Sequence, residues 1–174
     1  NIEYLLSIWR GVTTILFLLR KRGKFMIQSF INTVTPLTSN TDSVRFERDC
    51  IRTKGCDNWL CHNCGSANYD IVCGGIYEIT FNASISSATA GVVAFALFNN
   101  GEEIAGTRMV ETLAAADDYA NIGVTKNIKV CCKGDANISV RSIPAVATPT
   151  APATPIVTQT PIIISANIAL FSIR

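Results

Sequence analysis

The stretch that decides the fold is residues 75–107, which read GIYEITFNASISSATAGVVAFALFNNGEEIAGT. Its first part alternates strictly between apolar and polar side chains. The apolar positions are Tyr77, Ile79, Phe81, Ala83 and Ile85, and the polar positions between them are Glu78, Thr80, Asn82 and Ser84. Side chains of a β-strand point alternately to opposite faces. This period of two therefore predicts a strand with one face in the core and the other in water.

The second part of the stretch, residues 92–98, is apolar throughout, which predicts a strand that is covered on both faces. Asn99-Asn100-Gly101 follows it directly, and both Asn and Gly tolerate the positive φ of a tight hairpin turn. We therefore expect residues 102–107 to return as a short strand.

The same alternation continues toward the C-terminus. It predicts strands over residues 108–113, 122–130 and 136–143, with an acidic loop of small residues at 114–119. Residues 144–161 hold five of the six prolines, and proline cannot donate to a strand ladder, so we expect a loop there. Residues 161–164 and 169–173 are expected to be two closing strands. About eight short strands with regular turns indicate an all-β antiparallel sandwich.

Composition limits the classes of function. The chain has 174 residues, enough for one domain with a buried core. Hydrophobic residues make up 48% and charged residues 16%, which excludes a disordered acidic or basic protein. The net charge of +2 gives no case for nucleic-acid binding. The single histidine, His62, excludes any mechanism that needs two.

The first 25 residues differ from the rest, because an apolar run is followed by Arg20-Lys21-Arg22. A secretory signal has the opposite order. Three interpretations stay open: an anchor or amphipathic helix at a membrane, a helix that packs on a partner, or translated leader sequence that is not native protein. In the last case Met26 is the true start. A membrane partner is expected only if residues 1–25 are native.

A family resemblance rests on residues 74–107. Gly75-Ile76-Tyr77-Glu78-Ile79 resembles the Gly-x-Tyr-x-hydrophobic strand of C1q/tumour-necrosis-factor-like jelly rolls. The segments 86–91 and 99–107 and the end at 166–173 resemble bacterial members of that group. These members include the C-terminal domain of the exosporium glycoprotein BclA and stand-alone domains of Firmicutes and their phages. The long loop at 144–161 and the missing collagen stalk depart from the family pattern.

The resemblance implies an antiparallel jelly-roll β-sandwich at residues 44–174, preceded by an N-terminal arm at 26–43. It implies a homotrimer that builds or decorates an extracellular or particle surface on a spore, a cell or a phage, and it implies no catalysis. In such a trimer, apolar strand faces pack along the threefold axis, which would suit residues 92–98.

The cysteines are the most informative chemical feature of the sequence. A Cys-rich loop at 50–73 and a vicinal pair further on supply all seven: Cys50, Cys56, Cys61, Cys64, Cys73, Cys131 and Cys132. Disulfides within or between chains are one expectation, and reduced, packed thiols are another. A zinc site is a weaker possibility, from Cys61, Cys64 and one of Cys131 and Cys132, with Cys56 or His62 as the fourth ligand. No other cofactor is expected.

Other candidates are weaker. Asp117-Asp118 and Glu102-Glu103 are expected to be solvated turn residues, since neighbours on a strand point to opposite faces. Trp59 and Tyr119 are candidate ligand contacts in loops. The leading hypothesis is a non-enzymatic structural or adhesive surface module. The alternatives are a tip domain that binds a ligand or surface glycan, a disulfide-linked subunit of an extracellular fibre, and a small Cys-cluster zinc protein.

Overall fold

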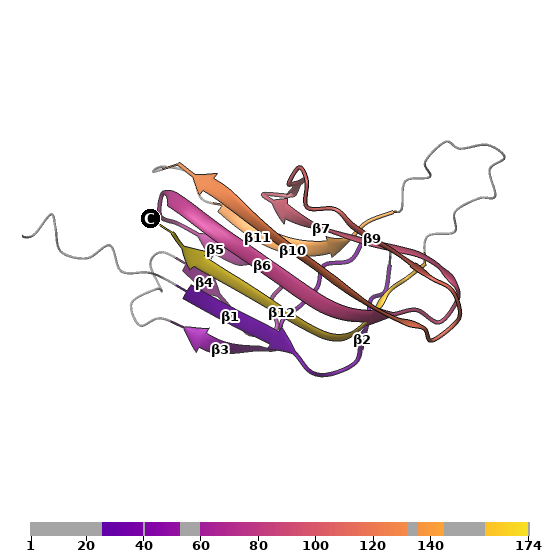
Figure 1. The fold of residues 1–174 in the computed structure, drawn as a ribbon. Helices are drawn as coiled ribbons and strands as arrows, with labels where there is room; N and C mark the ends of the chain where they lie inside the picture. Colours follow the sequence, from indigo (N-terminus) through magenta and orange to yellow (C-terminus); the bar gives the residue numbers. More distant parts are fainter. Residues whose placement is uncertain (1–25, 40, 53–59, 132–135, 145–158, 174) are drawn as a thin grey trace, which may run out of the picture.

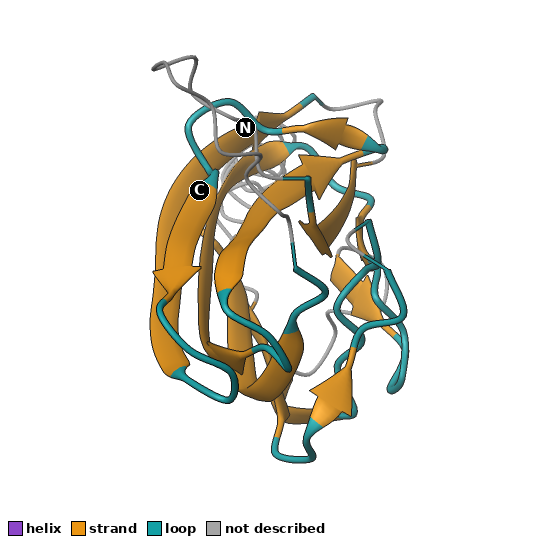
Figure 2. Cartoon of the chain, turned by 90° about the vertical axis from the view of Figure 1, so that its right-hand side faces the viewer, coloured by secondary structure: helices purple, strands orange, loops and turns teal. Residues whose placement is uncertain are grey.

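The computed structural model describes residues 26–39, 41–52, 60–131, 136–144 and 159–173. This part of the chain contains strands and no helix, and they form two antiparallel sheets of six strands each. The layers face each other as a sandwich (Figures 1 and 2). The all-β prediction is therefore confirmed. No helix in the described ranges is long and apolar enough to span a membrane.

The first sheet has the order β10-β6-β12-β1-β3, with the short β2 paired to β12 (Figure 1). The bounds of its strands are β1 Met26–Ile31, β2 Thr35–Pro36, β3 Arg48–Arg52, β6 Gly75–Ser86, β10 Tyr119–Val130 and β12 Ile162–Ser172. Residues 26–43, set apart above as an arm, contribute β1 and β2 to this sheet.

The second sheet has the order β4-β5-β11-β7-β8, and β9 pairs with β7 beside β8, on the edge away from β11. The bounds of its strands are β4 Leu60–His62, β5 Tyr69–Ile71, β7 Gly91–Asn99, β8 Glu102–Glu103, β9 Met109–Leu113 and β11 Ala136–Ser142. The segment predicted as a Cys-rich loop therefore contains β4, β5 and part of β3.

The core lies between the sheets, and β6 supplies its centre. Tyr77, Ile79, Phe81 and Ile85 are all buried, as their alternation predicts. Phe81 meets Phe46 edge to face, with the ring centroids 6.4 Å apart. Burying an aromatic or branched aliphatic side chain of this size contributes about 1.5–3 kcal/mol. The β6 alternation therefore fixes which face of the first sheet turns inward.

Strand β7 is buried on both faces within this chain, as its apolar run predicts. Val93, Phe95 and Leu97 belong to the main core, while Ala94 and Ala96 join Ile143 in a smaller cluster on the other face. The expectation that this strand packs along a threefold axis needs correction, because the chain already buries residues 93–97 itself.

The hairpin after β7 forms as the sequence predicts, with Asn100 at φ 51° and Gly101 at φ 85°. The returning strand is shorter than expected and covers only Glu102–Glu103. It stops there because Thr107 folds inward. The Thr107 hydroxyl accepts the Leu97 N–H at 3.1 Å and donates to the Ile104 carbonyl at 2.7 Å, in place of strand pairing.

The C-terminal end was predicted as two strands, and the structure corrects this to one, β12. The register against β6 shifts between Ile163 and Ser165. This bulge absorbs the extra residue, so the strand continues through Ser165-Ala166-Asn167 without a turn.

The Thr107 contact gives a testable prediction. Thr107→Val keeps the shape of the side chain but leaves the buried Leu97 N–H without its acceptor. We expect the free energy of unfolding to fall by about 1–3 kcal/mol, measured by urea denaturation. Thr112→Val on exposed β9 is the matched control, and we expect it to change stability by less than about 0.5 kcal/mol. Equal effects of the two variants would contradict the proposed role of Thr107.

Candidate functional site

The outer face of strands β10, β6, β12 and β1 in the first sheet carries few charged side chains, whereas on neighbouring β3 the exposed Arg48 lies opposite Phe30. Residues of β10, β6, β12 and β1 that alternate with the core positions point outward and form rows across the strands. One row is Gly123, Asn82, Asn167 and Phe30, and the next is Thr125, Thr80, Ala169 and Gln28. Among the outward positions of these four strands, charge occurs at Glu78 and Lys129, near one end.

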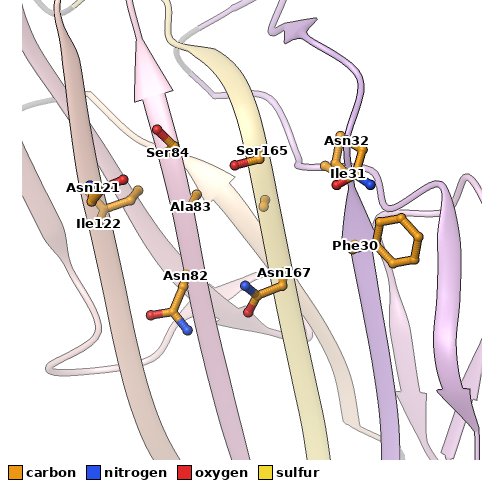
Figure 3. Close-up of a pocket in the computed structure, with 11 residues that line it drawn as sticks. Phe30, Ile31, Asn32, Asn82, Ala83, Ser84, Asn121, Ile122, Ser165 and Asn167 are labelled. Carbon is orange, nitrogen blue, oxygen red and sulfur yellow. The ribbon is translucent and has the colours of Figure 1, made fainter.

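A shallow groove of about 420 Å³ lies in this outer face (Figure 3). Four amides and two hydroxyls line it together with the ring of Phe30: Asn32, Asn82, Asn121, Asn167, Ser84 and Ser165. Asn32 directly follows β1, and the other five come from three adjacent strands, β10, β6 and β12, in matching register. We call this lined region the amide face.

Gly123 makes the amide face possible. A Cβ at this position would collide with the side-chain oxygen of Asn82 and would lie 3.3 Å from the Phe81 carbonyl. Glycine therefore leaves space for the Asn82 amide on the neighbouring strand. Amides and hydroxyls both donate and accept hydrogen bonds, so this face can bind a polar, uncharged surface. It offers no imidazole or carboxylate for acid–base chemistry.

A buried polar network lies elsewhere, where β1, β3 and β4 meet. His62 Nδ1 lies 2.7 Å from Asp49 Oδ1, and His62 Nε2 lies 3.2 Å from the Ser66 carbonyl oxygen. The Ser29 hydroxyl donates to the same Asp49 oxygen at 2.6 Å. The imidazole also stacks on Tyr69, with the ring centroids 4.1 Å apart. Burial raises the pKa of the Tyr69 hydroxyl well above its usual value.

These contacts concern His62 as the possible fourth zinc ligand. Both of its ring nitrogens lie within hydrogen-bond distance of an oxygen atom in this structure. The arrangement is not a nucleophile triad. In such a triad the histidine lies between the hydroxyl and the carboxylate, whereas here Asp49 lies between Ser29 and His62. The network is a structural clamp that the sequence did not reveal, since Ser29 and Asp49 are 20 residues apart and Asp49 and His62 are 13 residues apart.

The structure separates most of the described cysteines. Cys64 lies exposed in the turn that closes the β4–β5 hairpin, and Cys61 lies opposite Asp70 within that hairpin. Cys73 and Cys131 instead flank the paired ends of β6 and β10, at Gly75 and Val130. Cys64, Cys73 and Cys131 are free thiols, and Cys131 is exposed.

Among the described residues, no group of three or more His, Cys, Asp or Glu side chains could hold a metal ion. Cys56 and Cys132 lie outside the described residues, and so does Trp59. Cys50 is part of β3. The zinc and disulfide hypotheses therefore stay predictions.

Of the remaining candidates, Asp117 and Asp118 lie in the loop before β10, as expected, whereas Glu102 and Glu103 form the short strand β8 rather than a turn. Asp118 accepts the N–H groups of Ala114 and Tyr119, at 3.3 and 2.9 Å, and Asp117 adopts a positive φ of 58°. Glu103 forms an exposed ion pair with Arg108 at 2.6 Å. Tyr119 begins β10 and is 65% exposed, so it is accessible as a contact residue.

Solved structures share this arrangement of strands. The globular domain of zebrafish complement 1qA protein aligns with a TM-score of 0.58 at 12% identity, over 86% of this chain and 98% of its own. Murine APRIL at pH 5.0 aligns with a TM-score of 0.56 at 12% identity, over 87% of this chain and 100% of its own. The chain has the jelly-roll fold of the C1q and tumour-necrosis-factor domains.

Identities at this level concern the fold alone. A second structure of murine APRIL, at pH 8.0, gives a TM-score of 0.57 at 9% identity. No protein-family model matches the sequence, and no curated protein matches it. The jelly-roll prediction is confirmed, while the closer resemblance to bacterial domains such as that of BclA stays a prediction.

The buried clamp of the jelly roll gives a second prediction. Asp49→Ala leaves the enclosed His62 without its carboxylate partner, and we expect a loss of about 3 kcal/mol in the free energy of unfolding, measured by urea denaturation. Glu111→Ala, on the exposed side of β9, is the control and should leave stability nearly unchanged. A loss below about 0.5 kcal/mol for Asp49→Ala would show that the clamp does not stabilise the fold.

Proposed function

We propose that this chain is a non-enzymatic structural or adhesive module that assembles as a homotrimer on an outer surface of a spore, a cell or a phage. The observation that carries the proposal is the amide face: a groove of about 420 Å³ within the nearly uncharged outer face of strands β10, β6, β12 and β1. Such a face suits permanent contact with copies of itself.

Symmetry explains why these residue types suit self-association. Near a threefold axis, each side chain meets its own copies. Like charges would repel there, whereas an asparagine amide can donate to one copy and accept from another. Asn82 and Asn167 are exposed in the isolated chain and lie opposite each other on β6 and β12. Short side chains also lose less conformational entropy on contact than long ones do.

The trimer is also what the resemblance to C1q and tumour-necrosis-factor jelly rolls implies. The interface is assigned to the first sheet, because β7 in the second sheet is already buried by its own chain. The non-enzymatic part of the proposal rests on the groups present: amides and hydroxyls on the amide face, and an imidazole that is enclosed.

A disulfide-linked fibre subunit is the second candidate function, and exposed Cys64 and Cys131 favour it. The two thiols sit on different parts of the fold, so bonds from them would extend an assembly in more than one direction. Non-reducing gel electrophoresis of the full chain would then show a ladder that collapses with dithiothreitol. A single band without reductant, or a ladder that persists in the double variant Cys64→Ser/Cys131→Ser, would contradict this candidate.

The interface assignment gives a third prediction. Asn82→Arg places a long cation on the amide face, and we expect it to convert a trimer of 18.8 kDa chains to monomers. Light scattering coupled to size exclusion measures this directly, under reducing conditions. Thr112→Arg adds the same charge on exposed β9 of the other sheet and should leave the trimer intact.

Circular dichroism of Asn82→Arg should match that of the parent chain, because residue 82 points away from the core. A variant that stays trimeric places the interface elsewhere and overturns the assignment to the amide face.

A further inference from the structure

A second pocket, of about 460 Å³, lies on the outer side of the second sheet. Residues 41–43, Arg45, the turn at 65–68 and Arg141 of β11 line it. Two sets of backbone contacts bring these segments together. Val44 donates to the Val140 carbonyl at 2.9 Å on one side, and Phe46 donates to the Ser66 carbonyl at 3.1 Å on the other. The pocket is therefore built on paired backbone rather than on a free loop.

Alternation decides which side chains reach this pocket. Val44 and Phe46 are buried in the core. Ser43 precedes Val44, and Arg45 lies between the two buried residues, so both Ser43 and Arg45 point outward. Ser43 forms an antiparallel bridge with Arg141, which places the two on the same face. Arg45 lies two residues further along that face. The two guanidinium groups therefore rise from adjacent paired segments on one side of the sheet.

Arg141 is held in place without a carboxylate. Its Nε donates to the Ser139 hydroxyl at 3.2 Å, and its guanidinium lies over the Phe98 ring, 4.9 Å from the centroid. These contacts hold the side chain against β11 and β7, and the hydrogen bond uses one of the three guanidinium nitrogens. Within the described part of the chain, neither Arg141 nor Arg45 forms an ion pair.

The nearby acid is already engaged. Asp42 accepts the Thr38 N–H at 2.8 Å and also the Thr38 hydroxyl. These hydrogen bonds, and to a smaller extent the Arg45 charge, hold the pKa of the Asp42 carboxyl below its usual value, so it stays ionised and bonded to Thr38. With two arginines against one acid, the pocket carries an excess of positive charge.

We propose that this pocket binds the carboxylate of a small acidic sugar. The fork of a guanidinium matches the two oxygens of a carboxylate. Around the arginines, Thr41, Ser43, Ser66 and Asn68 supply hydroxyls and an amide of the kind that bind sugar hydroxyls. The volume falls in the range of small-ligand sites, about 300–1,000 Å³. The lining has little apolar surface, which does not suit a lipid or a drug-like molecule.

The pocket is independent of the amide face, because the two lie on different sheets. It would stay open to solvent in the proposed trimer. A monomeric protein that binds the sugar would contradict the trimer alone, and a trimer that does not bind would contradict this inference alone.

The experiment is a titration of the full chain with D-glucuronate, measured by isothermal titration calorimetry. D-glucose and inorganic phosphate are titrated in parallel as comparison ligands. We expect glucuronate to saturate at one site per chain and to bind at least about tenfold more tightly than glucose or phosphate. Arg45→Gln removes one exposed cation without touching the core and should weaken glucuronate binding about tenfold. Arg141→Lys keeps the charge but loses the fork, and should weaken it similarly.

The matched control is Arg108→Gln, which removes the same charge from an arginine outside the pocket. It should leave glucuronate affinity unchanged. Phosphate that binds as tightly as glucuronate would mean that any anion suffices, and would overturn the sugar assignment. Equal binding of glucose, or a glucuronate titration that does not saturate, would also overturn the assignment. So would an equal change in glucuronate affinity for Arg45→Gln and Arg108→Gln.

Discussion

The alternation of β6 is the constraint on which the rest of the structure depends. This strand pairs with β10 without a break in register from Gly75 to Ser86, and with β12 on its other edge. Its inward side chains build the centre of the core, and each outward one then has a fixed place beside its neighbours. A slip of one residue would exchange the faces, burying Asn82 and exposing Phe81. The alternation of β6 therefore determines both the core and the amide face.

The second sheet differs from the first in how its outer face is covered. Strand β7 is apolar on both faces and is covered on both, so it offers no apolar surface to a partner. On its outer side Ala94 and Ala96 pack with Ile143, and the ring of Phe98 lies under the guanidinium of Arg141. One sheet therefore presents neutral amides that suit contact between copies, while the other presents two guanidinium groups that suit an anion. The jelly roll holds the two surfaces apart.

Sequence predicted the strands with long alternation and also the continuous apolar run of β7, and it missed the short or irregular strands β1 to β5. Apolar and polar residues alternate over residues 75–86 and 119–130. Strand β6 was therefore predicted, and the strand expected at 122–130 covers most of β10. In β1, partly buried Met26 and Phe30 occupy the outer face opposite Ile27 and Ile31, and this hides the period. Strands β4 and β5 have three residues each, too few for a pattern. The His62 clamp and the arginine pocket depend on pairing between distant segments, which periodicity within one strand cannot show.

The central claim is that the outer face of the first sheet joins identical chains. Native mass spectrometry of the full chain under reducing conditions tests it most directly, since disulfides then cannot hold the assembly together. The account predicts a species of three 18.8 kDa chains as the main form at micromolar concentration. A monomer under these conditions would contradict the claim and leave the amide face as a solvent-exposed surface.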